Sequence, residues 1–271
     1  MKTGRISLSQ RNKVFYYTAV WVKRMQRYLK WAFGKEKYSK CFNKARLPFR
    51  VKKHSSVLIR KLGSSDIQLQ YNKIVNLKIA VKKINGIIIS PGETFSFCKT
   101  VGYTTKKKGY LPGIELYYGE ARPGIGGGLC QIANLIHWLV LHSPLEISER
   151  HHHSYDPFPD DGRILPFGSG ATIFYNYVDL QIKNNTPYNF QINLWLTGKC
   201  LEGELRIDTK LDYCYHVFER NHRFIKEGDD YFRENEIWRN KIAKYEGGKI
   251  LETELLIKNH SLVKYKPVNG G

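Results

Sequence analysis

The feature that most constrains the fold is an apolar segment that follows three consecutive glycines. Gly126–Gly128 precede the run Gln131–Leu141, whose apolar side chains would surround a helix on nearly every side. A helix with so little polar surface is stable only when the protein buries it, and Pro144 stops it from continuing. The sequence therefore predicts a buried helix that begins just after the glycines.

The rest of the chain predicts one more body helix and many strands. A helix over residues 71–85 carries apolar residues on one face and is followed by Gly86, a residue type that commonly ends helices. Residues 40–65 are expected to form a loop-rich connection. The predicted strands are short apolar or alternating runs and cover residues 87–89, 94–97, 145–149, 172–177, 178–183, 190–196, 201–207, 237–243 and 250–257. The runs 190–196 and 201–207 flank a turn at 197–200 and predict a hairpin. We expect an α+β fold with N-terminal helices, a buried helix after a Gly-rich turn, and mainly antiparallel β-structure in the C-terminal half.

Charge is distributed unevenly along the chain. Residues 1–61 contain 18 Lys and Arg and a single acid, Glu36, so they carry +17 of the total formal charge of +20. The remaining residues are nearly neutral. We therefore divide the chain into a basic N-terminal arm with an amphipathic helix (1–65), a core (66–186), and a β-rich C-terminal part that is continuous with the core (187–271).

The arm begins with residues 11–33, which suit an amphipathic helix. Apolar side chains recur there at spacings of three and four, namely Phe15, Ala19, Val22, Met25, Leu29 and Phe33. Lysines and arginines surround them, together with Trp and Tyr residues, which prefer the membrane–water interface. Such a helix could lie on an anionic membrane surface, or it could dock its apolar stripe on the domain. Nucleic acid is the weakest alternative, because no recognised motif accompanies the charge.

Cysteine usage and the first apolar stretch bear on the compartment. The five cysteines are odd in number and lack a C-x-x-C spacing, so neither a disulfide scaffold nor a zinc ribbon is expected. The apolar stretch Val14–Val22 has about half the length that a membrane span needs, and it lacks the cleavage site of a secretion signal. We expect a cytoplasmic protein with reduced thiols, peripheral on the inner membrane face if the arm binds lipid. The oligomeric state stays open.

The glycines place Cys130 where a cysteine nucleophile would lie. Glycine permits a sharp backbone turn and lets another group approach closely. The start of the following helix offers unpaired N–H groups and a partial positive charge, which lower a thiol pKa and can hold an oxyanion. Gln131 or the backbone N–H of Cys130 would then stabilise that oxyanion.

A base and an orienting group are also present in the sequence. His151, His152 and His153 lie on or just after a predicted strand. Because side chains alternate along a strand, His151 and His153 would share one face. Asp179 is a polar residue inside an apolar run and could orient the base. We expect no metal, since three adjacent histidines on a strand cannot all face one ion, and no cofactor.

The same residues also have interpretations without catalysis. Cys130 could be a small buried side chain, with the glycines allowing tight packing and the histidines forming a solvated cluster. The Gly126–Gly128 turn could instead bind a ligand. Glu93, beside the turn at Pro91-Gly92, could point into the site or lie on the surface.

Several segments together resemble the VanW family. They are Asn76–Ala80, Pro91–Phe97, Gly126–Gln131, Glu149–Ser154 and Ala171–Thr186. The family motif matches, position by position, Gly126, Gly127, Gly128, Cys130, Gln131, Arg150, His151 and His153. The resemblance covers about 72–186, so residues 66–186 are expected to be a VanW-like core. It implies a bacterial protein linked to glycopeptide resistance and the cell envelope, of a short type without the membrane anchor of many members.

Two hypotheses follow. In the leading one, the chain is a hydrolase or acyltransferase that acts on amide or ester bonds of a peptidoglycan-type peptide. Cys130 would be the nucleophile, His153 or His151 the base, and Asp179 the orienting residue. The ligand would be held by Gly126, Gly127, Gly128, Gln131, Arg150 and Glu93. The rival hypothesis is a non-enzymatic ligand-binding or scaffold protein peripheral to the membrane.

Overall fold

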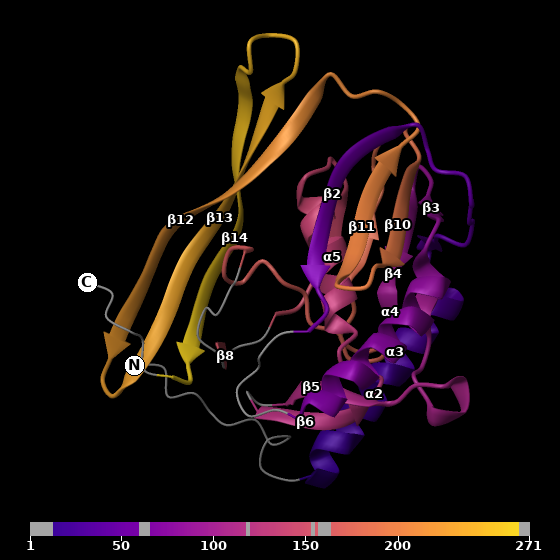
Figure 1. The fold of residues 1–271 in the computed structure, drawn as a ribbon, viewed down its shortest axis with the longest axis vertical. Helices are drawn as coiled ribbons and strands as arrows, with labels where there is room; N and C mark the ends of the chain where they lie inside the picture. The colour runs from indigo at the N-terminus through magenta and orange to yellow at the C-terminus, as the bar shows by residue number, and fades with distance from the viewer. Residues whose placement is uncertain (1–12, 60–65, 118–119, 153–154, 157–163, 266–271) are drawn as a thin grey trace.

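The computed structural model describes residues 13–59, 66–117, 120–152, 155–156 and 164–265 (Figure 1). Its helices are α2 (Lys13–Phe33), α3 (Ile67–Ile84), α4 (Phe97–Val101) and α5 (Cys130–Leu141), with a short 3-10 helix η1 at Lys106–Lys108. Strands dominate the second half of the chain. The predicted α+β fold is therefore confirmed.

The first sheet is antiparallel throughout and has the order β2-β11-β10-β3. Its strands are β2 (Phe49–Val57), β3 (Ile87–Ile89), β10 (Phe190–Leu196) and β11 (Cys200–Ile207). The β10–β11 pair is the predicted hairpin. The prediction of a loop-rich connection over 40–65 was wrong where β2 runs, because β2 finds its partner β11 about 150 residues later in the sequence.

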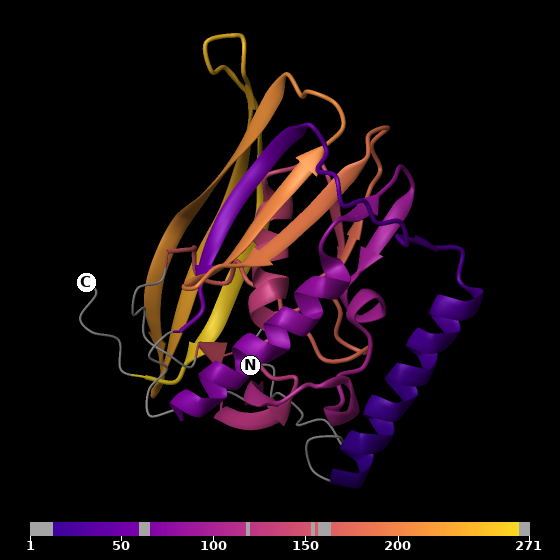
Figure 2. The ribbon, with the colours of Figure 1, turned by 45° about the vertical axis from the view of Figure 1, so that its right-hand side comes forward.

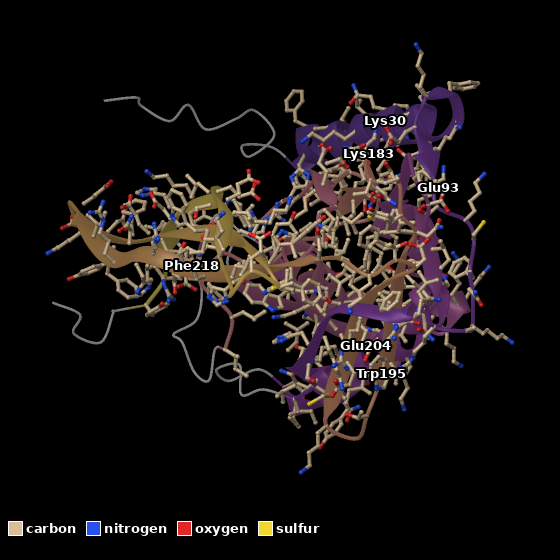
Figure 3. The ribbon with its side chains drawn as sticks, turned by 90° about the horizontal axis from the view of Figure 1, so that it is seen from above. Lys30, Glu93, Lys183, Trp195, Glu204 and Phe218 are labelled. Carbon is tan, nitrogen blue, oxygen red and sulfur yellow. The ribbon has the colours of Figure 1, made fainter. Side chains whose placement is uncertain are left out.

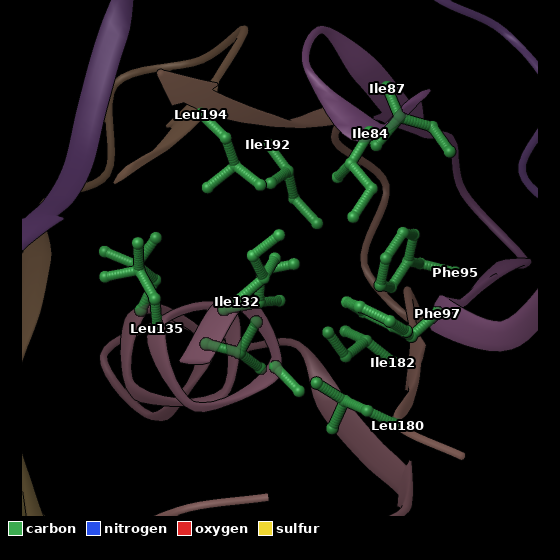
Figure 4. Packing of buried hydrophobic residues seen from close by; sticks show 14 of the residues in the cluster. Ile84, Ile87, Phe95, Phe97, Ile132, Leu135, Leu180, Ile182, Ile192 and Leu194 are labelled. Carbon is green, nitrogen blue, oxygen red and sulfur yellow. The ribbon is translucent and has the colours of Figure 1, made fainter. Parts of the chain in front are cut away.

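Helix α5 packs against this sheet and forms the centre of the core. Nine of its twelve residues are buried, which confirms the predicted buried helix. Ile132 and Leu135 face Ile192 and Leu194 of β10 (Figure 4). The approach to β11 is close, since a Cβ added at Gly203 would lie 2.9 Å from Cδ2 of Leu135.

A second sheet covers another side of the core and has the order β1-β4-β9-β7. Its strands are β1 (Lys37–Tyr38), β4 (Glu93–Ser96), β7 (Glu146–Glu149) and β9 (Gln181–Lys183). The prediction of a strand over 172–177 was wrong: this segment makes only a single bridge, between Phe174 and Val178. Asn176 has a positive φ of 37° and turns the chain back between those two residues.

The C-terminal strands form a third sheet beside α5, of order β12-β13-β14-β8 (Figures 1 and 2). Its strands are β8 (Tyr155–Asp156), β12 (Tyr213–Glu227), β13 (Asp230–Ala243) and β14 (Ile250–Val263), and a separate hairpin joins β5 (Pro112–Tyr117) to β6 (Glu120–Ile125). Trp138 and Leu141 of α5 pack on Val217 and Ile237 of this third sheet. Strands thus pair across both expected boundaries, residues 65 and 186, and the division into three parts stays a prediction.

Helix α2 lies along the outside of the body (Figure 2). The expected docked arrangement had the apolar stripe facing the domain, and the structure shows the reverse. Arg24 Nε donates to the Tyr175 carbonyl at 3.1 Å, and Arg27 pairs with Glu149. Leu29 is 53 % exposed and Phe33 83 %. Among the residues that the structure describes, no helix combines the length and the apolar character required to cross a membrane.

Candidate functional site

The Gly-rich turn is locked between helix α3 and strand β5. Gly126 and Gly128 have φ values of 82° and 93°, which favour glycine. A Cβ on Gly127 would lie 2.3 Å from the backbone of Gly113, so this glycine is needed for close packing as well. Asn76 of α3 donates its amide to the Gly127 carbonyl at 3.0 Å. The turn is a rigid support that presents the start of α5.

Cys130 stands at that helix start, half-buried. Its thiol donates a weak hydrogen bond to the Ile173 carbonyl oxygen, 4.0 Å from the sulfur. Burial raises the pKa of the Cys130 thiol, and the charge of Glu115 adds to the rise. The expected lowering of the thiol pKa is therefore not found, because loss of water outweighs the partial charge of the helix end.

Gln131, the other expected oxyanion donor, is engaged elsewhere. Its amide nitrogen donates to Ser56 Oγ and to the Val57 carbonyl, both at 2.9 Å. These contacts tie the start of α5 to strand β2. The side chain of Gln131 thus holds the sheet against the helix.

The histidine segment reaches the neighbourhood of Cys130 through its main chain. The His151 carbonyl accepts a hydrogen bond at 2.8 Å from the N–H of Thr172, the residue before Ile173. The His151 ring points to Glu149 instead, with Nε2 3.1 Å from Oε1. His153, the preferred base, lies outside the described residues.

Asp179 is brought close to Ser96 and α4, and its oxygens are occupied there. Ser96 Oγ donates to Asp179 Oδ2 at 2.5 Å, and the N–H groups of Cys98 and Leu180 donate to Oδ1 at 2.8 and 2.9 Å. Burial raises the pKa of Asp179, although the Ser96 hydrogen bond opposes this. Its observed contacts fix the start of α4, and they leave the orienting role without structural support.

Arg150 and Glu93, both expected to bind a ligand, also serve the fold. Arg150 donates Nε to the Gly170 carbonyl at 2.8 Å and Nη2 to the Gly168 carbonyl, and burial lowers its pKa to about 10. Glu93 accepts from the Ser90 N–H at 3.1 Å and closes its own turn. Among the described residues, no three His, Cys, Asp or Glu side chains are grouped to hold a metal ion.

Sequence reasoning missed the pair formed by Arg27 and Glu149. The guanidinium makes two hydrogen bonds to the carboxylate, at 2.6 and 2.5 Å, and the two side chains are 10 % and 18 % exposed. Burial would raise the pKa of Glu149, but hydrogen bonds from His151 and Arg27 lower it to about 2. Glu149 also accepts from the Asp179 N–H and the Gln181 amide. Glu149 lies in the segment Glu149–Ser154 that resembles the VanW family. Arg27 is one of many cations in the basic arm, and no neighbouring motif marks it as different.

A second missed pair lies on the β5–β6 hairpin, and the charge of its Glu115 acts on the Cys130 thiol. Glu115 and Arg122 face each other across the hairpin, with Arg122 Nε 4.0 Å from Glu115 Oε2. Burial raises the pKa of Glu115, and Arg122 opposes the shift. Their side chains are 29 % and 48 % exposed. The helix start that carries the thiol thus has a partly exposed ion pair in its surroundings.

The chain is similar to two curated proteins and matches one family. The family described as "VanW like protein" matches residues 72–206. The "Vancomycin B-type resistance protein VanW" of Enterococcus faecalis is 30 % identical over 228 residues, which cover 84 % of this chain and 82 % of that protein. The "Uncharacterized protein YoaR" of Bacillus subtilis is 32 % identical over 110 residues, 40 % of this chain and 34 % of that protein. No solved structure matches the chain. The chain belongs to the VanW family.

Proposed function

We propose that this chain is a VanW-type accessory protein of the bacterial cell envelope, linked to glycopeptide resistance, and that it binds a peptidoglycan-type peptide without covalent chemistry. The observation that carries the non-covalent mechanism is the environment of Cys130, whose thiol donates to the Ile173 carbonyl while the His151 ring points to Glu149. A thiol whose pKa is raised by burial is protonated at neutral pH, and the thiol form is a poor nucleophile. The link to glycopeptide resistance comes from the VanW family and from the Enterococcus faecalis relative, which is named as a vancomycin resistance protein.

The binding surface that we propose is the part of the hairpin next to Cys130. Glu115 and Arg122 are partly exposed and oppositely charged. A peptide that carries an amine and a carboxylate can form an ion pair with each residue, the amine with Glu115 and the carboxylate with Arg122. The guanidinium can bind a carboxylate through two hydrogen bonds. The locked glycine turn keeps Cys130 and this hairpin in a fixed arrangement, which lowers the entropic cost of binding.

Calorimetric titration with a peptidoglycan-type pentapeptide tests this proposal. We expect the protein to bind the peptide, Arg122→Gln to weaken binding about tenfold or more through loss of a charged hydrogen-bonded contact, and Cys130→Ala to retain binding. Lys107→Gln, which removes an exposed cation outside the hairpin, is the matched control. No heat of binding to the wild-type protein, or equal loss in Arg122→Gln and Lys107→Gln, contradicts the proposal.

A Cys–His hydrolase or acyltransferase is the second candidate, and one contact favours it. The hydrogen bond from Thr172 to the His151 carbonyl holds the backbone of His151 next to the residue that precedes Ile173, and the Ile173 carbonyl accepts from the thiol. In this mechanism His153 or His151 takes the thiol proton and the sulfur attacks the amide or ester carbonyl. The C–N or C–O bond then breaks as the same proton passes to the leaving group, and water or an acceptor nucleophile releases the acyl group from Cys130.

The rate of alkylation of the thiol separates the two candidates. For the binding protein, we expect iodoacetamide to modify Cys130 several-fold more slowly at neutral pH than the exposed Cys41 and Cys214. Faster modification of Cys130 than of either exposed cysteine would favour the enzyme. Peptide mapping by mass spectrometry identifies the modified residue.

A further inference from the structure

We propose that α2 lies on an anionic lipid surface with its apolar face among the headgroups, while its opposite face stays docked on the protein. This interaction uses the surface of α2 and not the hairpin proposed to bind the peptide, so it does not depend on the proposed function. It rests on how the helix divides its side chains between the protein and solvent.

The outward face of α2 carries exposed apolar side chains from its first turn to its last. Exposed fractions reach 69 % for Val14, 56 % for Phe15, 40 % for Val22 and Met25, 53 % for Leu29 and 83 % for Phe33. These positions recur at helical spacing and therefore form one stripe. A continuous apolar stripe on a soluble surface commonly marks a membrane or partner site.

The inward face is held by polar and cation–aromatic contacts and is not available to lipid. Arg27 is engaged with Glu149 and Arg24 with the Tyr175 carbonyl. The ammonium of Lys99 lies 5.3 Å from the ring centre of Trp31, and it donates to the Trp31 carbonyl at 3.4 Å. The rotation of α2 about its axis is thereby fixed, and the apolar stripe must point away from the body.

Cations border the helix from several parts of the chain. Lys23 and Lys30 are exposed on one flank of the stripe, and Figure 3 shows Lys30 beside Lys183. The only acid among residues 1–61, Glu36, is already paired with Lys183 at 3.3 Å. This flank therefore presents positive charge that is suited to anionic headgroups.

A lysine turn adds charge close to the middle of α2. The ring of Tyr103 lies 5.8 Å from the guanidinium carbon of Arg24, and Lys108 Nζ donates to the Tyr103 carbonyl at 2.9 Å. Lys106 and Lys107 precede Lys108 in η1, and all three lysines are exposed. Residues far apart in the sequence thus concentrate cations around one helix.

The aromatic residues favour lipid over nucleic acid. Tyr17, Trp21 and Tyr28 are 67 %, 63 % and 43 % exposed, and such side chains prefer the membrane–water interface. A nucleic-acid surface would need its cations at the centre, to reach phosphates. Here the centre is aliphatic and the cations lie at the border.

Vesicle co-sedimentation of the full chain tests the proposal. We expect binding to vesicles of phosphatidylcholine mixed with phosphatidylglycerol to be about tenfold or more tighter than binding to phosphatidylcholine alone. The double variant Val22→Glu, Leu29→Glu should lose at least about tenfold of the anionic-vesicle binding, because it places two charges in the apolar stripe. The matched control is Leu251→Glu, Leu255→Glu on β14, where the side chains are similarly exposed, at 48 % and 44 %, and binding should be unchanged.

Wild-type protein that stays in the supernatant with anionic vesicles overturns the proposal, as does equal binding by the α2 double variant. A second readout does not depend on how the double variant folds: Trp21 emission should shift to the blue with anionic vesicles, and Trp21→Phe should remove most of that shift. Absence of the shift in the wild type also overturns it. Binding to duplex DNA as tight as to vesicles, unaffected by the α2 double variant, would instead assign the arm to nucleic acid.

Discussion

Helices α5 and α2 are both rich in apolar residues, yet the protein holds them in opposite ways. Nine of the twelve residues of α5 are buried, and its contacts are mainly hydrophobic. Helix α2 turns its apolar side to solvent and attaches through Arg24 and Arg27. The apolar periodicity of a helix therefore predicts that an apolar face exists, and the partners of the charged residues decide where that face points.

The two modes of attachment should differ in strength and in sensitivity to conditions. Hydrophobic packing in a closed core is destroyed only when the protein unfolds. An ion pair at the edge of the body can be broken by protonation or by a single substitution, and the helix can then separate while the body stays folded. Four changes test this difference and are given in order of decreasing expected effect.

The largest effect is expected in α5, from Ile136→Ala. Ile136 is completely buried, and truncation of such a side chain removes burial and leaves a cavity, at a cost of about 3–4 kcal/mol in the free energy of unfolding. Urea unfolding followed by circular dichroism measures the loss. A loss below about 1 kcal/mol would mean that α5 is not the centre of the core.

Arg27→Ala should release α2 without unfolding the body. It leaves the carboxylate of Glu149 mostly buried without its cation, and we expect about 2–3 kcal/mol less protection of the α2 amides in hydrogen exchange. The control is Lys23→Ala, at an exposed position on the same helix. It should leave the protection of the α2 amides nearly unchanged. Equal effects of the two substitutions would show that the Glu149 contact does not hold the helix.

Acid should weaken the attachment in a defined range. Glu149 has a pKa of about 2 in the folded protein, below its ordinary value of 4.5. The stabilisation from its charged form is therefore complete above pH 4.5 and is lost as the pH falls toward 2, by on the order of 2 kcal/mol. Unfolding free energies across this range should fall less steeply in Glu149→Gln than in the wild type. Parallel curves would contradict the assignment.

The smallest effect is expected at the exposed stripe itself. Leu29→Gln removes an apolar side chain that is 53 % exposed, and the free energy of unfolding should change by less than about 0.5 kcal/mol. The same urea titration serves for comparison with Ile136→Ala. A larger loss would indicate that the stripe packs on protein in solution, for example on a second copy of the chain.

The sequence predicted elements whose signals are local. The β10–β11 hairpin follows from two apolar runs around Thr197 and Gly198, and α5 from its apolar run after the glycines. Strand β2 was missed because Arg50, Lys52 and Lys53 interrupt any alternation, while its partner β11 is distant in sequence. Strand β12 was missed for a related reason: much of it is charged and exposed.

The site was predicted only where its features depend on neighbouring residues in the sequence. The glycine turn and the position of Cys130 at a helix start are local features, and the structure has both. The thiol pKa depends on burial by segments distant in sequence, among them Ile173, so the expected lowering was wrong. The contact between Arg27 and Glu149 joins residues separated by 122 positions, and no spacing in the sequence could reveal it.

The short parallel strand β1 gives α2 a further property. Only Gly34, Lys35 and Glu36 separate the end of α2 from β1, which is hydrogen-bonded to β4. Three residues reach about 10 Å, so a released helix remains tethered beside its binding place. Its arginine is then present at an effective concentration on the order of millimolar. Any arginine-bearing peptide that approaches Glu149 from solution must compete with this internal ligand, and only a tight or multivalent competitor would succeed.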